Sequence, residues 1–270
     1  MRYRPGTFAA LALLGALAVG VASARTPARA VDDPAMVAAR ATLPPGPEGD
    51  LIREGRALIT DTQAHAGPYV KAGMSCDACH LEAGTKAHGG SFLGIAANFP
   101  QWNKRAKRFI TLADRLDECF LYSMNGTAPP PSSREVIAMI AYITFLSRGA
   151  EIGTGFPDQG FVTVNAPNPP DPKAGATIYA AQCSLCHGAD GAGNAAAKFP
   201  PLWGSASFND GAGMNTKMAA FVKANMPLGR GGSLTDQQAA DVSAFVLSHP
   251  RPHFDGTRAI AFPPEPAAFF

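Results

Sequence analysis

The chain has 270 residues, of which 46% are hydrophobic and 16% charged, and its formal net charge is +2 at pH 7. This length predicts about two domains, each able to bury its own hydrophobic core. So small a net charge excludes a protein that binds nucleic acid mainly by electrostatic attraction, because such proteins carry a large basic excess.

Residues 1–24 are typical of a secretory signal peptide. Two arginines precede the apolar stretch Phe8–Val21, which is shorter than the about 20 residues of a membrane span. Small residues predict cleavage after Ala24 or Ala30, and an uncleaved anchor is the alternative. We therefore expect a periplasmic protein with no membrane span after cleavage, beginning with a flexible lead-in over residues 25–50.

Two pentapeptides share one pattern, Cys76-Asp77-Ala78-Cys79-His80 and Cys183-Ser184-Leu185-Cys186-His187. Each is C-x-x-C-H, the attachment pattern of c-type haem. Both thiols of such a motif bond to the haem vinyl groups, and the histidine ligates the iron. The sequence therefore predicts two covalently bound haem c groups. A pair of redox or zinc motifs, the alternative, explains neither histidine and lacks the further cysteines of a zinc site.

A short helix with a central glycine is expected before each pentapeptide. These helices cover residues 51–60, with Gly55, and residues 172–182, with Gly175. A second helix is expected at the end of each half. Each of these later helices carries an aromatic residue expected to pack on the glycine: Tyr142 and Phe245.

The later helices are expected to begin at capping boxes, in which a hydroxyl and a Glu or Gln three residues on satisfy each other's backbone N–H groups. One box is Ser132 with Glu135, and the other is Thr235 with Gln238. Helical periodicity continues from them to Ser147 and Ser248.

This order of elements resembles class I cytochrome c domains, so the expected fold class is all-α, with two such domains in tandem. A Pro/Gly-rich linker, expected to be extended, joins the two domains. A small hairpin is expected near residues 161–164. The domain boundaries are 51–152 for the first, 153–172 for the linker, 173–250 for the second and 251–270 for a C-terminal tail.

Each haem iron takes a sixth ligand from the chain or leaves that position open. In the second half the candidates are Met214, Met218 and Met226. Met226 follows an expected helix over residues 217–224 and precedes Pro227, and small cytochromes c present their distal thioether from such a loop. Met226 is therefore the expected ligand, and another methionine is the alternative.

The first half has a cysteine at the equivalent register, because the spacing from His80 to Cys119 equals that from His187 to Met226. Cys119 is the only cysteine outside the pentapeptides, and an unpaired thiol in an oxidising compartment is a liability unless it is bound or used. We expect it to ligate the first iron and to act as a nucleophile. A small buried hydrophobic role is the alternative. The other candidate ligands are Met124, His88 and His65.

Basic residues are concentrated near Cys119. Residues 86–115 contain six lysines and arginines but one acidic residue, Asp114. If the following segment is helical, Arg115, Cys119 and Ser123 share one face. A sulfur nucleophile, guanidinium groups and a hydroxyl favour a small divalent oxyanion as ligand. The alternative is a solvated basic face or a docking patch for an acidic partner.

Four segments of the first half stand out together: Gly90-Ser91-Phe92, Asn98-Phe99-Pro100, Arg115-Leu116-Asp117-Glu118-Cys119-Phe120 and Ser123-Met124-Asn125-Gly126. They resemble the catalytic half of dihaem thiosulfate dehydrogenases. In the second half, Asn225-Met226-Pro227-Leu228-Gly229 resembles the electron-exit domain of that family. The resemblance spans residues 48–250, and the Cys-Phe…Ser-Met-Asn-Gly string is its most specific part.

This resemblance implies oxidation of two thiosulfate ions to tetrathionate. It implies that His80 and Cys119 ligate the first haem, that Arg105 and Arg115 hold the sulfonate groups, and that Ser123 assists. Thiolate ligation lowers a haem potential and methionine ligation raises it, so electrons are expected to pass from the first haem to the second. The expected acceptor is a small periplasmic cytochrome c or iron–sulfur protein.

Three other functions are compatible with parts of the pattern. One is a dihaem electron carrier without substrate chemistry. Another is a thiolate-haem subunit of a sulfur-oxidising complex, which needs a companion protein with a sulfur-carrying cysteine. The third is the same chemistry in reverse, the reduction of tetrathionate.

Overall fold

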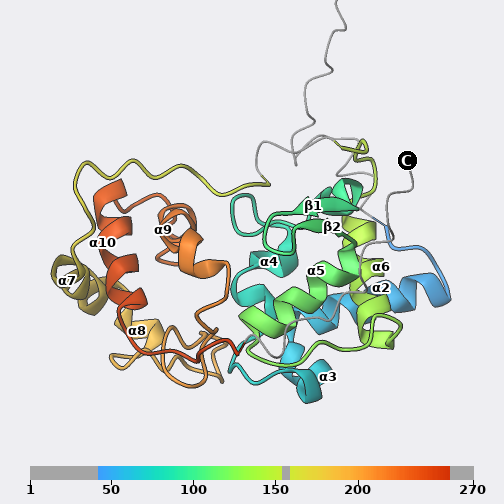
Figure 1. The fold of residues 1–270 in the computed structure, drawn as a ribbon, viewed down its shortest axis with the longest axis horizontal. Helices are drawn as coiled ribbons and strands as arrows, with labels where there is room; N and C mark the ends of the chain where they lie inside the picture. The colour runs from blue at the N-terminus through green and yellow to red at the C-terminus, as the bar shows by residue number, and fades with distance from the viewer. Residues whose placement is uncertain (1–41, 154–158, 256–270) are drawn as a thin grey trace, which may run out of the picture.

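The computed structural model describes residues 42–153 and 159–255, and the predicted signal peptide lies outside these ranges. Two groups of helices lie side by side (Figure 1), with α2 to α6 in one group and α7 to α10 in the other. Within the described ranges, every helix falls short of the length and apolar character that a membrane crossing requires.

The first group contains α2 (Pro47–Thr60), α3 (Thr62–Ala66), α4 (Leu81–Gly84), α5 (Leu112–Glu118), a π-helical turn (Cys119–Ser123) and α6 (Arg134–Leu146). It also contains 3-10 turns at Gly67–Tyr69, Cys76–Ala78 and Ile95–Asn98, and strands β1 (Gln101–Asn103) and β2 (Arg108–Ile110). The second group contains α7 (Pro172–Gln182), α8 (Ser184–His187), α9 (Met214–Asn225) and α10 (Asp236–Leu247).

The expected helix crossings are confirmed in both halves. A Cβ atom at Gly55 of α2 would lie 2.0 Å from the carbonyl oxygen of Ala138 and 2.8 Å from Cβ of Tyr142, both on α6. At Gly175 of α7, a Cβ atom would lie 2.9 Å from Cβ of Phe245 on α10. Only glycine permits backbones to approach this closely, so each half is fixed by one crossing of the same kind.

The capping boxes are confirmed at one helix and shifted at the other. Thr235 and Gln238 form the expected reciprocal pair at the start of α10. At α6 the expected box at Ser132 is wrong, because the helix begins one residue later. Ser133 is the N-cap, and its hydroxyl accepts a 3.3 Å hydrogen bond from the backbone N–H of Val136.

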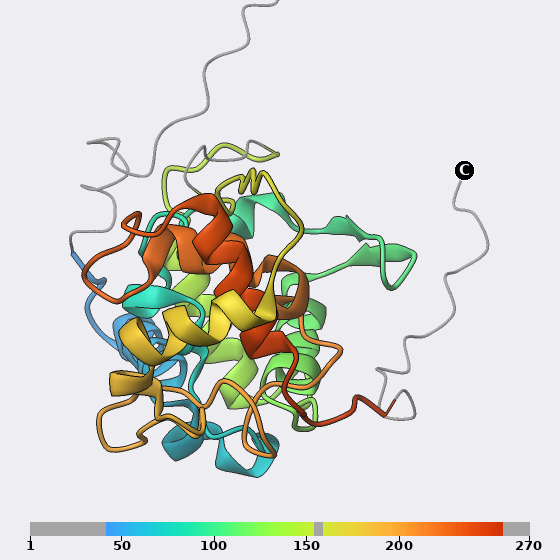
Figure 2. The same ribbon diagram turned by 90° about the vertical axis from the view of Figure 1, so that its left-hand side faces the viewer.

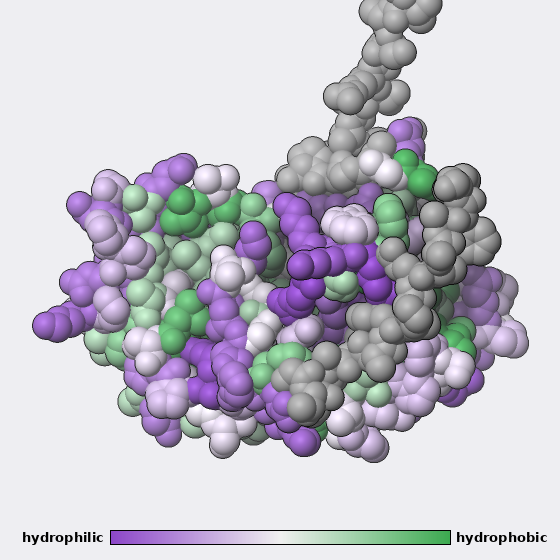
Figure 3. All heavy atoms as spheres, viewed as in Figure 1, coloured by the Kyte–Doolittle hydropathy of each residue, from purple (hydrophilic) through white to green (hydrophobic). Residues whose placement is uncertain are grey.

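The β-structure is not where it was expected. Residues 161–164 form no strand, and β1 and β2 instead form an antiparallel hairpin in which Trp102 pairs with Phe109. This hairpin projects from the first group of helices (Figure 2), and hydrophilic side chains gather over it (Figure 3). The all-α expectation therefore needs correction, because the described part of the chain forms helices and one short two-stranded sheet.

The described residues that precede α7, 159–171, are hydrogen-bonded to the second group. Backbone N–H groups of Asn165 and Asp171 donate 2.8 Å hydrogen bonds to the carboxylates of Asp236 and Asp241 on α10. The groups also contact each other directly, since the N–H of Gly73 donates to the carbonyl of Ala206 at 2.7 Å.

Candidate functional site: two haem attachment segments and a cysteine between arginines

The two C-x-x-C-H histidines present the same nitrogen to the backbone. Nδ1 of His80 lies 2.5 Å from the carbonyl oxygen of Gly90, and Nδ1 of His187 lies 3.0 Å from that of Pro200. A carbonyl requires the Nδ1–H tautomer, which leaves Nε2 of each ring to bind iron. Burial lowers the pKa of His80 to about 4 and also lowers that of His187, so both rings stay in the neutral form that ligates metal.

The first attachment segment is held by α3. The hydroxyl of Thr62, which is fully buried, accepts a 2.9 Å hydrogen bond from the backbone N–H of Cys76 and lies 3.3 Å from its Sγ atom. Burial raises the pKa of Cys76 and of Cys79 to about 12. All four pentapeptide cysteines are free of disulfides. Unpaired thiols beside an oriented, neutral histidine fit the thioether attachment of haem c.

The second attachment segment opens onto a cavity of about 300 Å³. Its wall includes His187 and all three candidate methionines, Met214, Met218 and Met226. Met226 directly follows α9, and its N–H donates to the carbonyl of Val222 at 2.9 Å. The structure thus brings the predicted distal residue into the same cavity as the histidine.

Residues of the first attachment segment form part of that same wall. Met74, Leu81 and the run 77–79 line the cavity together with the second-half residues. The two attachment segments are therefore neighbours across the junction of the two halves. The passage of electrons from the first haem to the second, which the sequence predicts, requires such proximity.

Cys119 lies at the point where α5 gives way to the π-helical turn. A charge on its sulfur contributes to the raised pKa of both Cys76 and Cys79, which places it within electrostatic reach of the first attachment segment. π-Helical turns occur often at functional sites. Cys119 therefore interacts electrostatically with both cysteines of the first attachment segment.

The other candidate ligands of the first haem have different surroundings. His65 is exposed on α3. His88 directs Nδ1 to the carbonyl of Gly160 at 2.8 Å. Met124 is 2% exposed and belongs to the hydrophobic core.

Two arginines act electrostatically on Cys119. Burial raises the pKa of the Cys119 thiol, whereas Arg115 and Arg105 lower it. In the opposite direction, Cys119 is the main cause of the raised pKa of Arg115. Arg105 also lies over the ring of Tyr122, with its Cζ atom 4.1 Å from the ring centroid. Ser123 is half-buried at the end of the π turn.

Glu118 is a site residue that the sequence analysis missed. It is 4% exposed, accepts a 2.7 Å hydrogen bond from Nη1 of Arg115, and accepts two of 3.0 Å from Nδ2 of Asn103 on β1. An acidic residue three positions after an arginine in a basic segment was the available signal. Two other basic residues of the segment 86–115 form ion pairs: Lys86 pairs with Glu82, and Arg108 pairs with Asp114.

Comparison with known proteins agrees with this division into halves. The SoxA/TsdA cytochrome c domain matches residues 63–152, and the family of cbb3-type cytochrome c oxidase subunit III matches residues 170–246. A thiosulfate dehydrogenase of Allochromatium vinosum is 43% identical over 228 residues, which are 81% of this chain and 84% of that protein. One of Stutzerimonas stutzeri is 44% identical over 216 residues, or 78% of this chain and 70% of that protein.

A solved structure is similar as well. The TsdBA thiosulfate dehydrogenase of Marichromatium purpuratum aligns with a TM-score of 0.75 at 35% identity, covering 83% of this chain. This chain spans about half of that one, 53% of its length. The protein therefore consists of two cytochrome c domains in tandem, and it belongs to the thiosulfate dehydrogenase family.

Proposed function

We propose that this protein oxidises two thiosulfate ions to one tetrathionate and passes the two electrons through two haem c groups. The observation that carries the proposal is the position of Cys119 one helical turn after Arg115 and in the same π turn as Tyr122, whose ring lies under the guanidinium of Arg105. A thiol between guanidinium groups suits a small sulfur dianion. The similarity to thiosulfate dehydrogenases supports the choice of thiosulfate.

The haem sites in this proposal use the residues described above. His80 and Cys119 ligate the first iron, and His187 and Met226 ligate the second. When bound, the two haems supply one-electron carriers that accept electrons from the substrate site and release them to an external acceptor. The thioether bonds are formed by Cys76, Cys79, Cys183 and Cys186.

The arginines overcome the main obstacle to joining two dianions, which is their mutual repulsion. Arg115 and Arg105 neutralise part of this charge and hold the two ions near each other. Glu118 orients Arg115 through the 2.7 Å hydrogen bond. In this proposal the hydroxyl of Ser123, at the end of the π turn, donates to a sulfonate oxygen.

Cys119 then forms and breaks one sulfur–sulfur bond. Its thiolate bonds to the terminal sulfur of the first thiosulfate with loss of two electrons, giving Sγ–S–SO₃⁻. The terminal sulfur of the second thiosulfate attacks the middle sulfur of this group. The Sγ–S bond breaks, tetrathionate leaves, and the Cys119 thiolate is restored. Each step is reversible, so the same residues also support reduction of tetrathionate.

Electrons leave from the second domain in this proposal. Leu228 lines the cavity beside the second attachment segment and is 60% exposed, and Leu185, inside the second pentapeptide, is 96% exposed. Exposed apolar side chains beside a redox site favour transient docking of another protein. A small periplasmic cytochrome c or iron–sulfur protein is the proposed acceptor.

Replacement of the nucleophile tests the proposal. We expect the Cys119→Gly holoprotein to retain both haems and to lose thiosulfate oxidation by at least a hundredfold, because an essential nucleophile contributes at least this much. The assay supplies thiosulfate and ferricyanide and measures tetrathionate. Met124→Leu, a change of similar volume at another candidate ligand, is the matched control and should retain the parental rate.

The outcomes separate the alternatives. Tetrathionate production by Cys119→Gly at the parental rate would refute the proposed chemistry. A parental protein that exchanges electrons with ferricyanide but forms no tetrathionate would be an electron carrier. Loss of activity in Met124→Leu with retention in Cys119→Gly would assign the first ligand to the methionine.

A further inference from the structure

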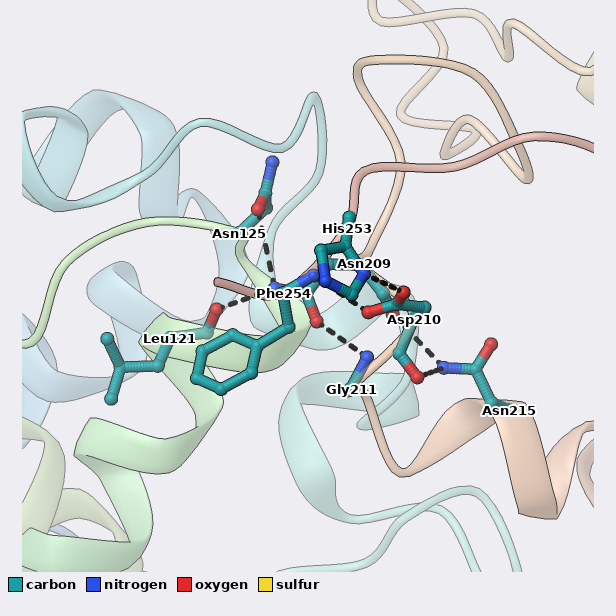
Figure 4. A network of polar contacts seen from close by, with 8 residues as sticks. All are labelled: Leu121, Asn125, Asn209, Asp210, Gly211, Asn215, His253 and Phe254. Atoms are coloured by element: carbon teal, nitrogen blue, oxygen red, sulfur yellow. Dashed lines mark hydrogen bonds and ion pairs between the residues drawn. The ribbon is translucent and has the colours of Figure 1, made fainter. Parts of the chain in front are cut away.

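Asn209 occupies the junction of the two domains and has no solvent exposure. Its Nδ2 group donates to the carbonyl of Leu121 at 2.9 Å and to Oδ1 of Asn125 at 3.3 Å (Figure 4). Its backbone N–H donates to the carbonyl of Tyr122 at 3.2 Å. Its Oδ1 atom accepts from the N–H of Gly211 at 3.0 Å. A second-domain side chain is thus bonded mainly to first-domain partners.

Two of these partners belong to the π-helical turn that begins at Cys119. The last carbonyls of any helix lack partners within the helix. Here the carbonyl of Cys119 accepts a hydrogen bond from the N–H of Met124, and that of Phe120 accepts one from the N–H of Gly126, both at 2.9 Å. The next two carbonyls, those of Leu121 and Tyr122, receive their hydrogen bonds from Asn209. The turn is therefore capped by a residue of the other domain.

The residue after Asn209 reinforces the same contact. Asp210 accepts a 2.7 Å hydrogen bond from the backbone N–H of Phe254. The ring of Phe254 packs on Tyr122 with the ring centroids 4.5 Å apart, and Arg105 lies over the same tyrosine ring. Asn209 thus binds the backbone of the π turn directly. Asp210 holds Phe254, whose ring packs on the side chain of Tyr122 in the same turn.

We propose that Asn209 is a positioning residue that holds the π turn, and with it the sulfur of Cys119, in the geometry that ligates the first haem. This inference rests on the proposed function, in which Cys119 is that ligand. A π turn is an uncommon conformation that persists where its surroundings hold it. The position of the Cys119 sulfur in the first domain therefore depends on the packing of the second domain against it. The two domains do not act as independent cytochromes.

The test uses the holoprotein with Asn209→Asp, which keeps the size of the side chain and the acceptor for Gly211 but removes the Nδ2 donor, and with Asn209→Ala. We expect both variants to lose most of the low-spin thiolate signature of the oxidised first haem in optical and electron paramagnetic resonance spectra. The kcat/KM for thiosulfate should fall by about ten- to a hundredfold, as for other residues that orient metal ligands. The methionine-ligated signature of the second haem should persist, showing that the protein remains folded.

Asn215→Ala is the matched control. Nδ2 of Asn215 also donates to carbonyls in this network, those of Asn209, Asp210 and Ala212, but all three lie in the second domain. The control should retain the first-haem signature. Its loss in Asn215→Ala to the same extent as in Asn209→Asp would overturn the assignment to Asn209.

Failure of this inference is distinguishable from failure of the proposed function. A parental protein without a thiolate signature at the first haem would contradict the proposed ligation by Cys119 and, with it, this inference. A parental protein with that signature, unchanged in Asn209→Asp and Asn209→Ala, would overturn the positioning role alone and leave the proposed function intact.

Discussion

The guanidinium of Arg115 donates a 2.7 Å hydrogen bond to the carboxylate of Glu118, and the glutamate side chain is 5% exposed whereas the arginine is 47% exposed. The same carboxylate binds Nδ2 of Asn103, whose Oδ1 atom accepts from the backbone N–H of Arg105 at 2.8 Å. The buried carboxylate of Glu118 thus binds Arg115 directly. Through Asn103 it is also connected to the backbone of Arg105, which lies in the turn between β1 and β2.

Substitution of this carboxylate should weaken substrate binding. We expect Glu118→Gln to lower kcat/KM for thiosulfate about tenfold, because a hydrogen bond between charged groups contributes about 1.5 kcal/mol or more. Steady-state kinetics measure the change. Glu48→Gln breaks another arginine–glutamate pair, the exposed one with Arg148, and should have no effect. Equal kinetics for Glu118→Gln and the parent would exclude a positioning role for Glu118.

The midpoint potential of the second haem shows which methionine is its ligand. We expect Met226→His to lower the midpoint potential of this haem by on the order of 0.1 V, because axial ligands set haem potentials over a range of about 0.8 V. Met218→Leu changes a buried methionine of the same cavity and should leave the potential within error of the parent. Spectroelectrochemical titration measures both. A shift in Met218→Leu alone would move the ligand assignment to Met218.

Asp117 makes stability depend on pH. Burial is the main cause that raises its pKa from 3.8 to about 6, and its Oδ1 atom has no hydrogen-bond partner among the described residues. The folded state therefore binds a proton more tightly than the unfolded state, and stability decreases as pH rises from about 4 to about 6.

Asp117→Asn should remove this decrease. We expect its free energy of unfolding at pH 8 to exceed that of the parent by up to about 3 kcal/mol, the equivalent of the pKa shift. Urea denaturation of the holoproteins at pH 5 and pH 8 measures the difference. Asp50→Asn, at an exposed carboxylate on α2, should change stability by less than about 0.5 kcal/mol. The same change in stability from pH 5 to pH 8 in the parent and in Asp117→Asn would contradict the raised pKa.

The crossing of α2 and α6 leaves no room for a methyl group. A Cβ atom at Gly55 would lie 2.0 Å from a backbone oxygen, so we expect Gly55→Ala to destabilise the protein by about 3 kcal/mol or more. Nothing lies within 4 Å of a Cβ atom at Gly67, which has φ of −48°, so Gly67→Ala should be neutral or slightly stabilising. Thermal denaturation measures both, and equal melting temperatures for the two variants would contradict the close crossing.

The features predicted well from the sequence are those encoded over short distances. The C-x-x-C-H spacing identifies the attachment residues because the chemistry requires adjacent positions. The helices around Gly55 and Gly175 follow from local periodicity, and the cap at Thr235 follows from four consecutive residues. The roles of Cys119 and Met226 remain predictions that the experiments above address, and the roles of Arg105, Arg115 and Ser123 remain predictions as well.

The features that the sequence analysis missed depend on contacts between distant residues. Strands β1 and β2 have three residues each, too few for an alternating pattern, and they exist because they pair with each other. Asn209 lies 88 residues from the carbonyl of Leu121, and nothing in its local sequence distinguishes it from an asparagine in a loop. The N-cap of α6 was predicted one residue too early because Ser132 and Ser133 have the same side chain and either could cap the helix.

The run 77–79 belongs to the first attachment pentapeptide and also lines the cavity of the second. The two proposed haem sites therefore share part of their surroundings, and a substitution in this run is expected to alter the dielectric environment of both. A substitution in the run 77–79 is therefore expected to change the midpoint potentials of both proposed haems together. Double-mutant cycles, rather than single substitutions, would separate its effect on one haem from its effect on the other.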